Sequence, residues 1–191
     1  PSIGSVGRLA LTSRTAGADT AWRLTVDGGD ISGLAPAALS KGTRIELREL
    51  FYATPARLKF LRADRTESAQ IGDAISRLAM ARPDVSFTLI DGERTKIKLE
   101  AAQGELLEAR LRRLGGVMGK EFTENALPIE AEREGIRLTG YAGLPTLNRG
   151  NAQLQFLFVN GRSVKDRLLF GAVRGAYQDF LARFETQGKI D

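Results

Sequence analysis

The chain has 191 residues, of which 42% are hydrophobic and 27% are charged, a composition typical of globular proteins with a sizeable core. It contains no cysteine and no histidine, which excludes disulfides, the usual structural zinc sites and histidine-dependent catalysis. The formal net charge of +5 favours an anionic partner such as a nucleic acid or nucleotide, with a basic surface that binds neither as an equal alternative.

The first part of the chain contains three segments in which apolar and polar side chains alternate. They predict strands over residues 7–15, 20–30 and 43–50. The stretch between the last two, residues 31–42, is predicted to be a loop. A short helix is predicted to follow the third strand at once, because Pro55 suits a first helical turn and Thr54 can cap its free N–H groups.

A longer helix is predicted from Thr66 or Ser68 to about Arg82, where a proline ends it. The spacing of its apolar residues predicts one buried stripe, formed by Ile71, Ile75, Leu78 and Ala79. Two strands are then predicted on either side of the Asp-Gly dipeptide at residues 91–92, which is the strongest hairpin signal in the chain.

A domain boundary is predicted near Gln103. The helix that follows carries its leucines on one face and is predicted to end at Gly115-Gly116, because paired glycines are typical of helix C-termini. Two antiparallel strands are predicted within residues 126–143. Residues 153–162 are apolar on both faces, which is typical of a central strand.

The last predicted element is a helix over residues 164–183. The residues predicted to face the core from it are Leu168, Leu169, Ala172, Val173, Ala176 and Phe180. The predicted fold is therefore α+β, in two units that each combine hairpin-built sheet with packed helices.

Three motifs occur in an order and spacing that resemble one known family. They are SIGSVGRLALTSR, GTRIELRELFYATPARLKFL and FVNGRSVKDRLL, at residues 2–14, 42–61 and 158–169. In this order they resemble the MutL family of DNA mismatch repair proteins, and the likeness extends over residues 1–183.

The resemblance implies more than the residue pattern shows. Proteins of this family carry a GHKL-type ATPase domain, shared with gyrase and histidine kinases, followed by a transducer domain with a ribosomal-protein-like α/β fold. On this basis residues 1–103 are expected to be the C-terminal part of the ATPase domain, with a partial GHKL-type sheet. Residues 104–191 are expected to be a truncated transducer domain. ATP binding closes a dimer in this family and couples it to mismatch repair.

The resemblance also implies what the chain lacks. The catalytic glutamate, the Mg²⁺-binding asparagine and the adenine-binding Asp-Asn-Gly motif are expected upstream of Pro1, and the phosphate-binding lysine loop is expected downstream. The chain is therefore expected to be an excised fragment without ATPase activity, catalytic residues, a metal site or a bound cofactor, from a parent that uses ATP and Mg²⁺. The expected location is cytoplasmic and nucleoid-associated, in a bacterium.

Gly42 and Thr43 match the family's last nucleotide-binding motif. A threonine hydroxyl at the start of a strand can support the carboxylate that reads the adenine amino group, and glycine lets the backbone approach the ligand. Without the surrounding motif, the same two residues read as an ordinary loop end.

A basic cluster follows the last predicted strand, and the resemblance assigns it to DNA. The predicted DNA-binding residues are Arg162, Lys165, Arg167 and Arg174. Such contacts would be directed at the phosphate backbone, without reading sequence, and would weaken with salt. The alternative is a helix whose outer face is merely charged.

Two further basic groups have simpler explanations. Arg57, Lys59 and Arg62 form either a phosphate-binding patch or a solvated face, and the arginines at 110, 112 and 113 are expected to pair with nearby glutamates on a wet surface. The expected partners are DNA, a second copy of the chain and other mismatch repair proteins. The competing hypothesis is a protein-interaction and dimerisation module that does not bind DNA.

Overall fold

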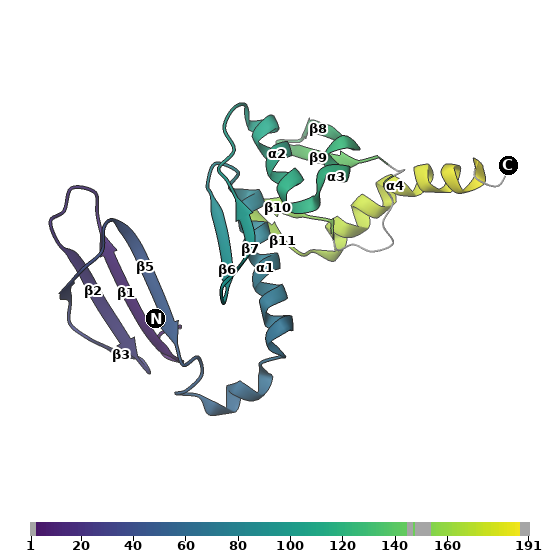
Figure 1. Cartoon of the computed structure of the whole chain (residues 1–191). Helices are drawn as coiled ribbons and strands as arrows, with labels where there is room; N and C mark the ends of the chain where they lie inside the picture. The colour runs from purple at the N-terminus through teal and green to yellow at the C-terminus, as the bar shows by residue number, and fades with distance from the viewer. Residues whose placement is uncertain (1–2, 145–146, 148–153, 188–191) are drawn as a thin grey trace. The chain divides into compact units, whose positions relative to one another are not determined.

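The computed structural model describes residues 3–144, 147 and 154–187. The chain contacts divide it into two compact units, Pro1–Ala63 and Asp64–Asp191, which are drawn in Figure 1 and described separately here. This division does not test the predicted domain boundary near Gln103, which stays a prediction. Within the described residues the fold mixes helices with antiparallel sheets, which confirms the α+β class.

The first unit is built around one antiparallel sheet in the order β3–β2–β1–β5, with β4 also paired to β2. Its strands are β1 (Arg8–Arg14), β2 (Ala21–Asp27), β3 (Asp30–Ile31), β4 (Ala35–Ala37) and β5 (Gly42–Arg48). The three strands predicted from alternation are confirmed. The loop prediction for residues 31–42 is wrong in part, because the backbone there pairs with β2 through segments too short to show alternation.

The register of this sheet separates an apolar face from a charged one. Leu9 lies opposite Val26 on one side and Leu47 on the other, while their neighbours in β1 lie opposite charged and polar side chains. Trp22 and Ile45 belong to the apolar face and are 49% and 65% exposed. The described residues therefore leave this face largely open to solvent.

The segment Gly4–Gly7 lies between two turns of the first unit. The carbonyl oxygen of Val6 accepts a hydrogen bond of 2.6 Å from the N–H of Phe51, and that of Gly4 accepts one of 3.1 Å from Gly29. Gly4 and Gly7 are both buried. Phe51 has φ 68° and the nearby Glu49 has φ 50°, so the turn after β5 contains two residues in the left-handed region that non-glycine residues seldom adopt.

The helix after this turn is η1 (Pro55–Phe60), a 3₁₀ helix. The prediction that Thr54 caps it is wrong, since the Thr54 side chain makes no capping hydrogen bond and its hydroxyl oxygen is buried without a partner in the described part of the chain. The backbone closes the first turn instead, through a 2.9 Å hydrogen bond from the N–H of Arg57 to the carbonyl of Thr54.

The second unit contains helices packed around short hairpins. Its elements in chain order are α1 (Asp64–Ala81), β6 (Phe87–Asp91), β7 (Arg94–Leu99), α2 (Leu106–Met118), α3 (Lys120–Glu124), β8 (Ala126–Arg133), β9 (Ile136–Gly143), β10 (Leu157–Val159), β11 (Arg162–Val164) and α4 (Arg167–Gln187). The strands pair as β6–β7, β8–β9 and β10–β11, each a two-stranded sheet. The hairpins predicted around residues 91–92 and within 126–143 are confirmed.

Helix α1 begins earlier than predicted, and its predicted buried stripe is wrong for most positions. Ala79 is fully buried, but Ile71 and Leu78 are 51% and 57% exposed, and the other buried residue is Met80. The elements that contact α1 most extensively are α2, β6, β7 and β11. Among the described residues these neighbours do not cover the flank that carries Ile71 and Leu78.

The prediction that α2 ends at Gly115-Gly116 is wrong, because the helix continues to Met118 and ends at Gly119, whose φ is 95°. Packing explains the two internal glycines. A Cβ on Gly116 would lie 2.7 Å from a methyl carbon of Leu99, and one on Gly115 would lie 3.1 Å from the methyl carbon of Thr123. The glycines let α2 approach its neighbours closely.

The predicted central strand at residues 153–162 is also wrong. The structure has the three-residue strand β10, which pairs only with β11 among the described residues. Asn160 and Gly161 adopt φ angles of 49° and 75°, which suit the two-residue turn of a tight hairpin. The tight turn at Asn160 and Gly161 therefore determines the local structure, and the apolar residues before it form one strand of a short hairpin.

Helix α4 begins at Arg167 because the carboxylate of Asp166 caps it, accepting hydrogen bonds of 2.9 and 3.0 Å from the N–H groups of Leu168 and Leu169. The prediction that these leucines face the core is wrong, since they are 83% and 40% exposed. Ala172 and Ala176 are exposed as well, Val173 is half-buried, and the Phe180 side chain lies outside the described residues. No helix in the described ranges is long and apolar enough to cross a membrane.

The β8–β9 turn offers a stabilising substitution. Glu134 has φ 52° and Gly135 has φ 76°, so a glutamate occupies a left-handed position that asparagine adopts at lower cost. Glu134→Asn is expected to raise the free energy of unfolding by about 0.5–1 kcal/mol. Urea denaturation measures the change, with Glu132→Asn within β8 as the control that should not stabilise. A loss of stability in Glu134→Asn would contradict the assigned turn.

Candidate functional site

Gly42 and Thr43 begin β5, where the sheet pairs them with the end of β1. Gly42 has φ 90°, and a Cβ placed on it would meet nothing within 4 Å, so its backbone is open to an approaching molecule. The Thr43 hydroxyl lies 2.9 Å from the hydroxyl of Ser13, and both residues are exposed. The site is therefore an accessible strand end with one hydroxyl pair.

The predicted DNA-binding residues come from β11, the connection after it and α4. Arg162 begins β11, Arg167 begins α4, and Arg174 lies further along that helix. All three are exposed and form no ion pair with other described residues. They therefore present positive charge to solvent.

Lys165 differs from these arginines because it forms an ion pair with the carboxylate of Asp73. Its Nζ lies 3.3 Å from Oδ2 of Asp73 in α1, and the same oxygen accepts a 2.9 Å hydrogen bond from Nε of Arg77. The hydrogen bond from Arg77 lowers the pKa of Asp73 below its usual value, Lys165 adds to this effect, and partial burial opposes it. Asp73 is therefore ionised at neutral pH and shared between two cations.

Arg77 joins α1 to the β10–β11 hairpin. Its guanidinium carbon lies 4.7 Å from the centre of the Phe156 ring, and its Nη1 donates a 3.3 Å hydrogen bond to the hydroxyl of Ser163. Its side chain is only 13% exposed. Sequence reasoning missed both Asp73 and Arg77, although their i, i+4 spacing signals an ion pair along a helix.

Arg113 contradicts the prediction that the arginines of α2 pair on a wet surface. It is 3% exposed and donates from Nη2 to the carbonyl oxygens of Pro83 and Val85, at 2.9 and 2.5 Å. Its guanidinium carbon lies 5.8 Å from the centre of the Phe87 ring, and its Nε and Nη1 have no partner in the described residues. Burial lowers the pKa of the Arg113 guanidinium, and Asp84 partly opposes this.

Arg57 and Lys59 are exposed on η1 and form no ion pair with other described residues. They belong to the first unit, whereas the basic cluster at β11 and α4 belongs to the second.

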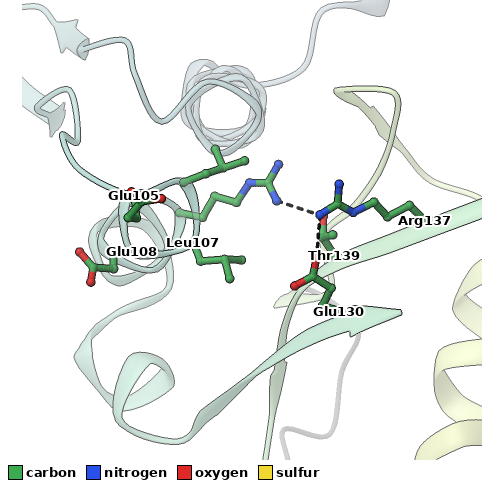
Figure 2. Close-up of a pocket in the computed structure, with 8 residues that line it drawn as sticks. Glu105, Leu107, Glu108, Glu130, Arg137 and Thr139 are labelled. Carbon is green, nitrogen blue, oxygen red and sulfur yellow. Dashed lines mark hydrogen bonds and ion pairs between the residues drawn. The ribbon is translucent and has the colours of Figure 1, made fainter. Parts of the chain in front are cut away.

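A cleft of about 710 Å³ lies between α2 and the β8–β9 hairpin, and none of the predicted site residues line it. Figure 2 shows Glu105 and Glu108 on the α2 side of this cleft and Glu130, Arg137 and Thr139 on the hairpin side. Arg137 pairs with Glu130 at 2.6 Å, and Arg110 donates a 3.0 Å hydrogen bond to the Thr139 hydroxyl. Much of the polar lining is thus already paired.

Comparison with known proteins tests the predicted family resemblance. A family model described as "DNA mismatch repair protein, C-terminal domain" matches residues 114–187. The DNA mismatch repair protein MutL of Rhodospirillum rubrum is 64% identical over 182 residues, which is 95% of this chain and 29% of that protein. The MutL of Paramagnetospirillum magneticum is 61% identical over 183 residues, or 96% of this chain and 30% of that protein. The chain belongs to the MutL family.

The MutL proteins it matches are longer than this chain, which spans about 30% of their length. Among solved structures, the ATPase domain of Aquifex aeolicus MutL complexed with ADP gives a TM-score of 0.75 at 28% identity, covering 91% of this chain and 65% of that chain. The N-terminal domain of a DNA repair protein gives the same TM-score at 18% identity and supports the fold alone. The predicted MutL resemblance is confirmed.

Proposed function

We propose that the chain is part of a MutL-type DNA mismatch repair ATPase whose full-length form binds ATP and Mg²⁺ and couples ATP-driven dimerisation to repair. The observation that carries this proposal is 64% identity to a MutL protein over 95% of the chain. In this assignment residues 1–103 are the end of the ATPase domain and 104–191 are a truncated transducer domain, in a cytoplasmic, nucleoid-associated protein.

Gly42 and Thr43 contribute to the adenine side of the parent's nucleotide site in this proposal. The open space at Gly42 and its left-handed backbone fit a ligand that approaches the main chain closely. The residues expected to hold Mg²⁺ and to carry out hydrolysis lie outside the chain by analogy with the family. The 191-residue chain is therefore proposed to lack ATPase activity, and hydrolysis of Mg²⁺-ATP by it would contradict this assignment.

The chain's own activity in this proposal is weak, sequence-independent binding to the DNA backbone. The exposed guanidinium groups of Arg162, Arg167 and Arg174 suit phosphate, because a planar guanidinium can donate two hydrogen bonds to phosphate oxygens. Lys165 adds a fourth cation between β11 and α4. Neutralised phosphates release counterions, so this binding must weaken as the salt concentration rises.

Fluorescence anisotropy with a labelled duplex of random sequence tests the proposal. The affinity is expected to fall linearly on a log–log plot against salt between about 50 and about 200 mM. The double variant Arg162→Glu and Arg167→Glu is expected to weaken binding at least about tenfold and to make the slope shallower by about 2, because each lost phosphate contact removes about 0.9.

The matched control reverses two exposed arginines elsewhere in the second unit, with Arg94→Glu on β7 and Arg133→Glu on β8. It carries the same change in net charge and is expected to retain most of the affinity. Equal losses in both double variants would show a general charge effect, and binding that does not depend on salt would refute the DNA proposal.

The alternative function is a protein-interaction and dimerisation module that meets a second copy or another mismatch repair protein. The observation that favours it is the apolar surface near the basic cluster, where Val159 is 50% and Leu168 is 83% exposed. Sedimentation of the chain as a stable dimer that binds no duplex DNA at low salt would favour this alternative.

A further inference from the structure

The ion pair between Asp73 and Lys165 sets Lys165 apart from the other cations of the proposed DNA site. Nζ of Lys165 lies 3.3 Å from the Asp73 carboxylate, whereas Arg162, Arg167 and Arg174 have no such partner among the described residues. The side chains of Lys165 and Asp73 are 67% and 41% exposed, so both remain within reach of a ligand in solution.

We infer that Asp73 is an internal competitor for DNA phosphate at Lys165, and that it lowers the affinity of the proposed site. The inference rests on the proposed DNA function. A phosphate at Lys165 must compete with the Asp73 carboxylate, because the carboxylate neutralises part of the ammonium charge and repels a second anion at the same group. Asp73 therefore acts as a positioning residue that withholds one cation from the nucleic acid.

The strength of the pair makes this competition reversible. An exposed ion pair changes an equilibrium constant by roughly twofold to fivefold. A phosphate on a duplex lies in a field of many negative charges, so it competes with a single carboxylate of that strength and Lys165 is divided between the two. Whenever Lys165 stays with Asp73, it neutralises no phosphate, and the counterion that this contact would release stays on the duplex.

The same exchange connects the DNA site to α1. When Lys165 turns to phosphate, Asp73 retains Arg77, which stays stacked on Phe156 and bound to Ser163. One of the two cationic links between α1 and the β10–β11 region is lost while the other remains. Because coupling is reciprocal, a movement of α1 that strengthens the Asp73–Lys165 pair must weaken DNA binding by the same factor.

The experiment measures duplex affinity against salt for the chain and for Asp73→Asn, Lys165→Gln and the double variant. Asparagine keeps an oxygen that accepts the Arg77 hydrogen bond but removes the charge that holds Lys165. Asp73→Asn is expected to bind DNA about two- to fivefold more tightly and to show a salt slope steeper by up to about 0.9, because Lys165 is then always available to phosphate. In the Lys165→Gln background the same change is expected to give a smaller gain and no steeper slope.

The control is Asp91→Asn, which breaks the exposed pair of Asp91 with Lys96, 2.5 Å apart, on another hairpin. An equal gain from Asp91→Asn, or an equal gain from Asp73→Asn with and without Lys165, would overturn the inference. If the double variant of Arg162 and Arg167 loses binding while Asp73→Asn changes nothing, the inference fails and the DNA function stands. Absence of DNA binding by every variant would overturn both.

Discussion

Replacing Arg113 with alanine is expected to lower the free energy of unfolding of the second unit by about 2–3 kcal/mol. The change removes the side-chain donor to the carbonyl oxygen of Val85 and one of two donors to that of Pro83, which also accepts a 2.8 Å hydrogen bond from the N–H of Ala102. It also leaves a cavity at α2 where the buried arginine side chain now lies, with its guanidinium group over the Phe87 ring. Urea denaturation followed by circular dichroism gives the change in stability.

The neighbouring residue provides the control. Arg112 lies on the same helix and is exposed, so Arg112→Ala is expected to change stability by no more than about 0.5 kcal/mol. Arg113→Lys is expected to lie between the two, because lysine keeps the charge but cannot place a guanidinium fork on two carbonyls. Equal stabilities for Arg112→Ala and Arg113→Ala would show that the buried contacts of Arg113 do not stabilise the unit.

Gly4→Val is expected to destabilise the first unit by about 3 kcal/mol or to prevent its folding. A Cβ on Gly4 would lie 2.8 and 2.9 Å from the Cγ1 and Cβ of Val26. Val26 is buried in β2, and a β-branched side chain has little freedom to move aside, so the strand itself would have to shift. Thermal unfolding of the chain, monitored by the fluorescence of Trp22, tests this expectation.

Gly33→Val provides the comparison, because a Cβ on Gly33 meets nothing within 4 Å and its backbone is not left-handed. It is expected to change stability by no more than about 0.5 kcal/mol. A milder change at Gly4 adds a graded test, since Gly4→Ala should lie between the wild-type chain and Gly4→Val. If Gly4→Val unfolds at the wild-type temperature, the segment Gly4–Gly7 does not pack as described.

The elements that could be predicted from the sequence are those whose signal is local. The strands β1, β2 and β5 alternate clearly, because one face of their sheet is apolar and the other is charged. The β6–β7 and β8–β9 turns each have a glycine at a position of positive φ, Gly92 and Gly135, although Glu134 suits its own left-handed position less well. The prediction that β10 is a central strand was wrong, because a run of apolar residues does not show whether strands pair with it on both sides.

Burial was predicted less well than secondary structure. The periodicity of α1 and α4 placed apolar residues on one face, but the described elements cover only part of it, so Leu78 and Leu168 remain exposed. Arg113 shows the opposite error. It follows Ala109 by one helical turn and precedes Gly116 on the same face of α2. Because arginine is charged, the spacing of apolar residues did not assign it to the buried face.

The candidate sites could be located from motifs, whereas their contacts could not. The motifs placed Gly42 at the start of a strand and Arg167 in the last helix, and the structure has them at the first residues of β5 and α4. Arg162 was expected to follow a buried strand but begins β11 instead. The role of each residue stays a prediction. The partner of Lys165 lies on α1, far away in the sequence, and only the folded chain brings Asp73 to it.

The left-handed turn at Glu49 and Phe51 has a consequence for the start of the chain. Each such residue holds of the order of 1–3 kcal/mol of conformational energy, which must be offset by its surroundings. Here the carbonyl of Val6 provides one anchor, through the amide of Phe51. Displacing the N-terminal segment would therefore remove one support of this strained backbone and leave the turn to the contacts of Glu49 with Arg8 and of Tyr52 with Asp27.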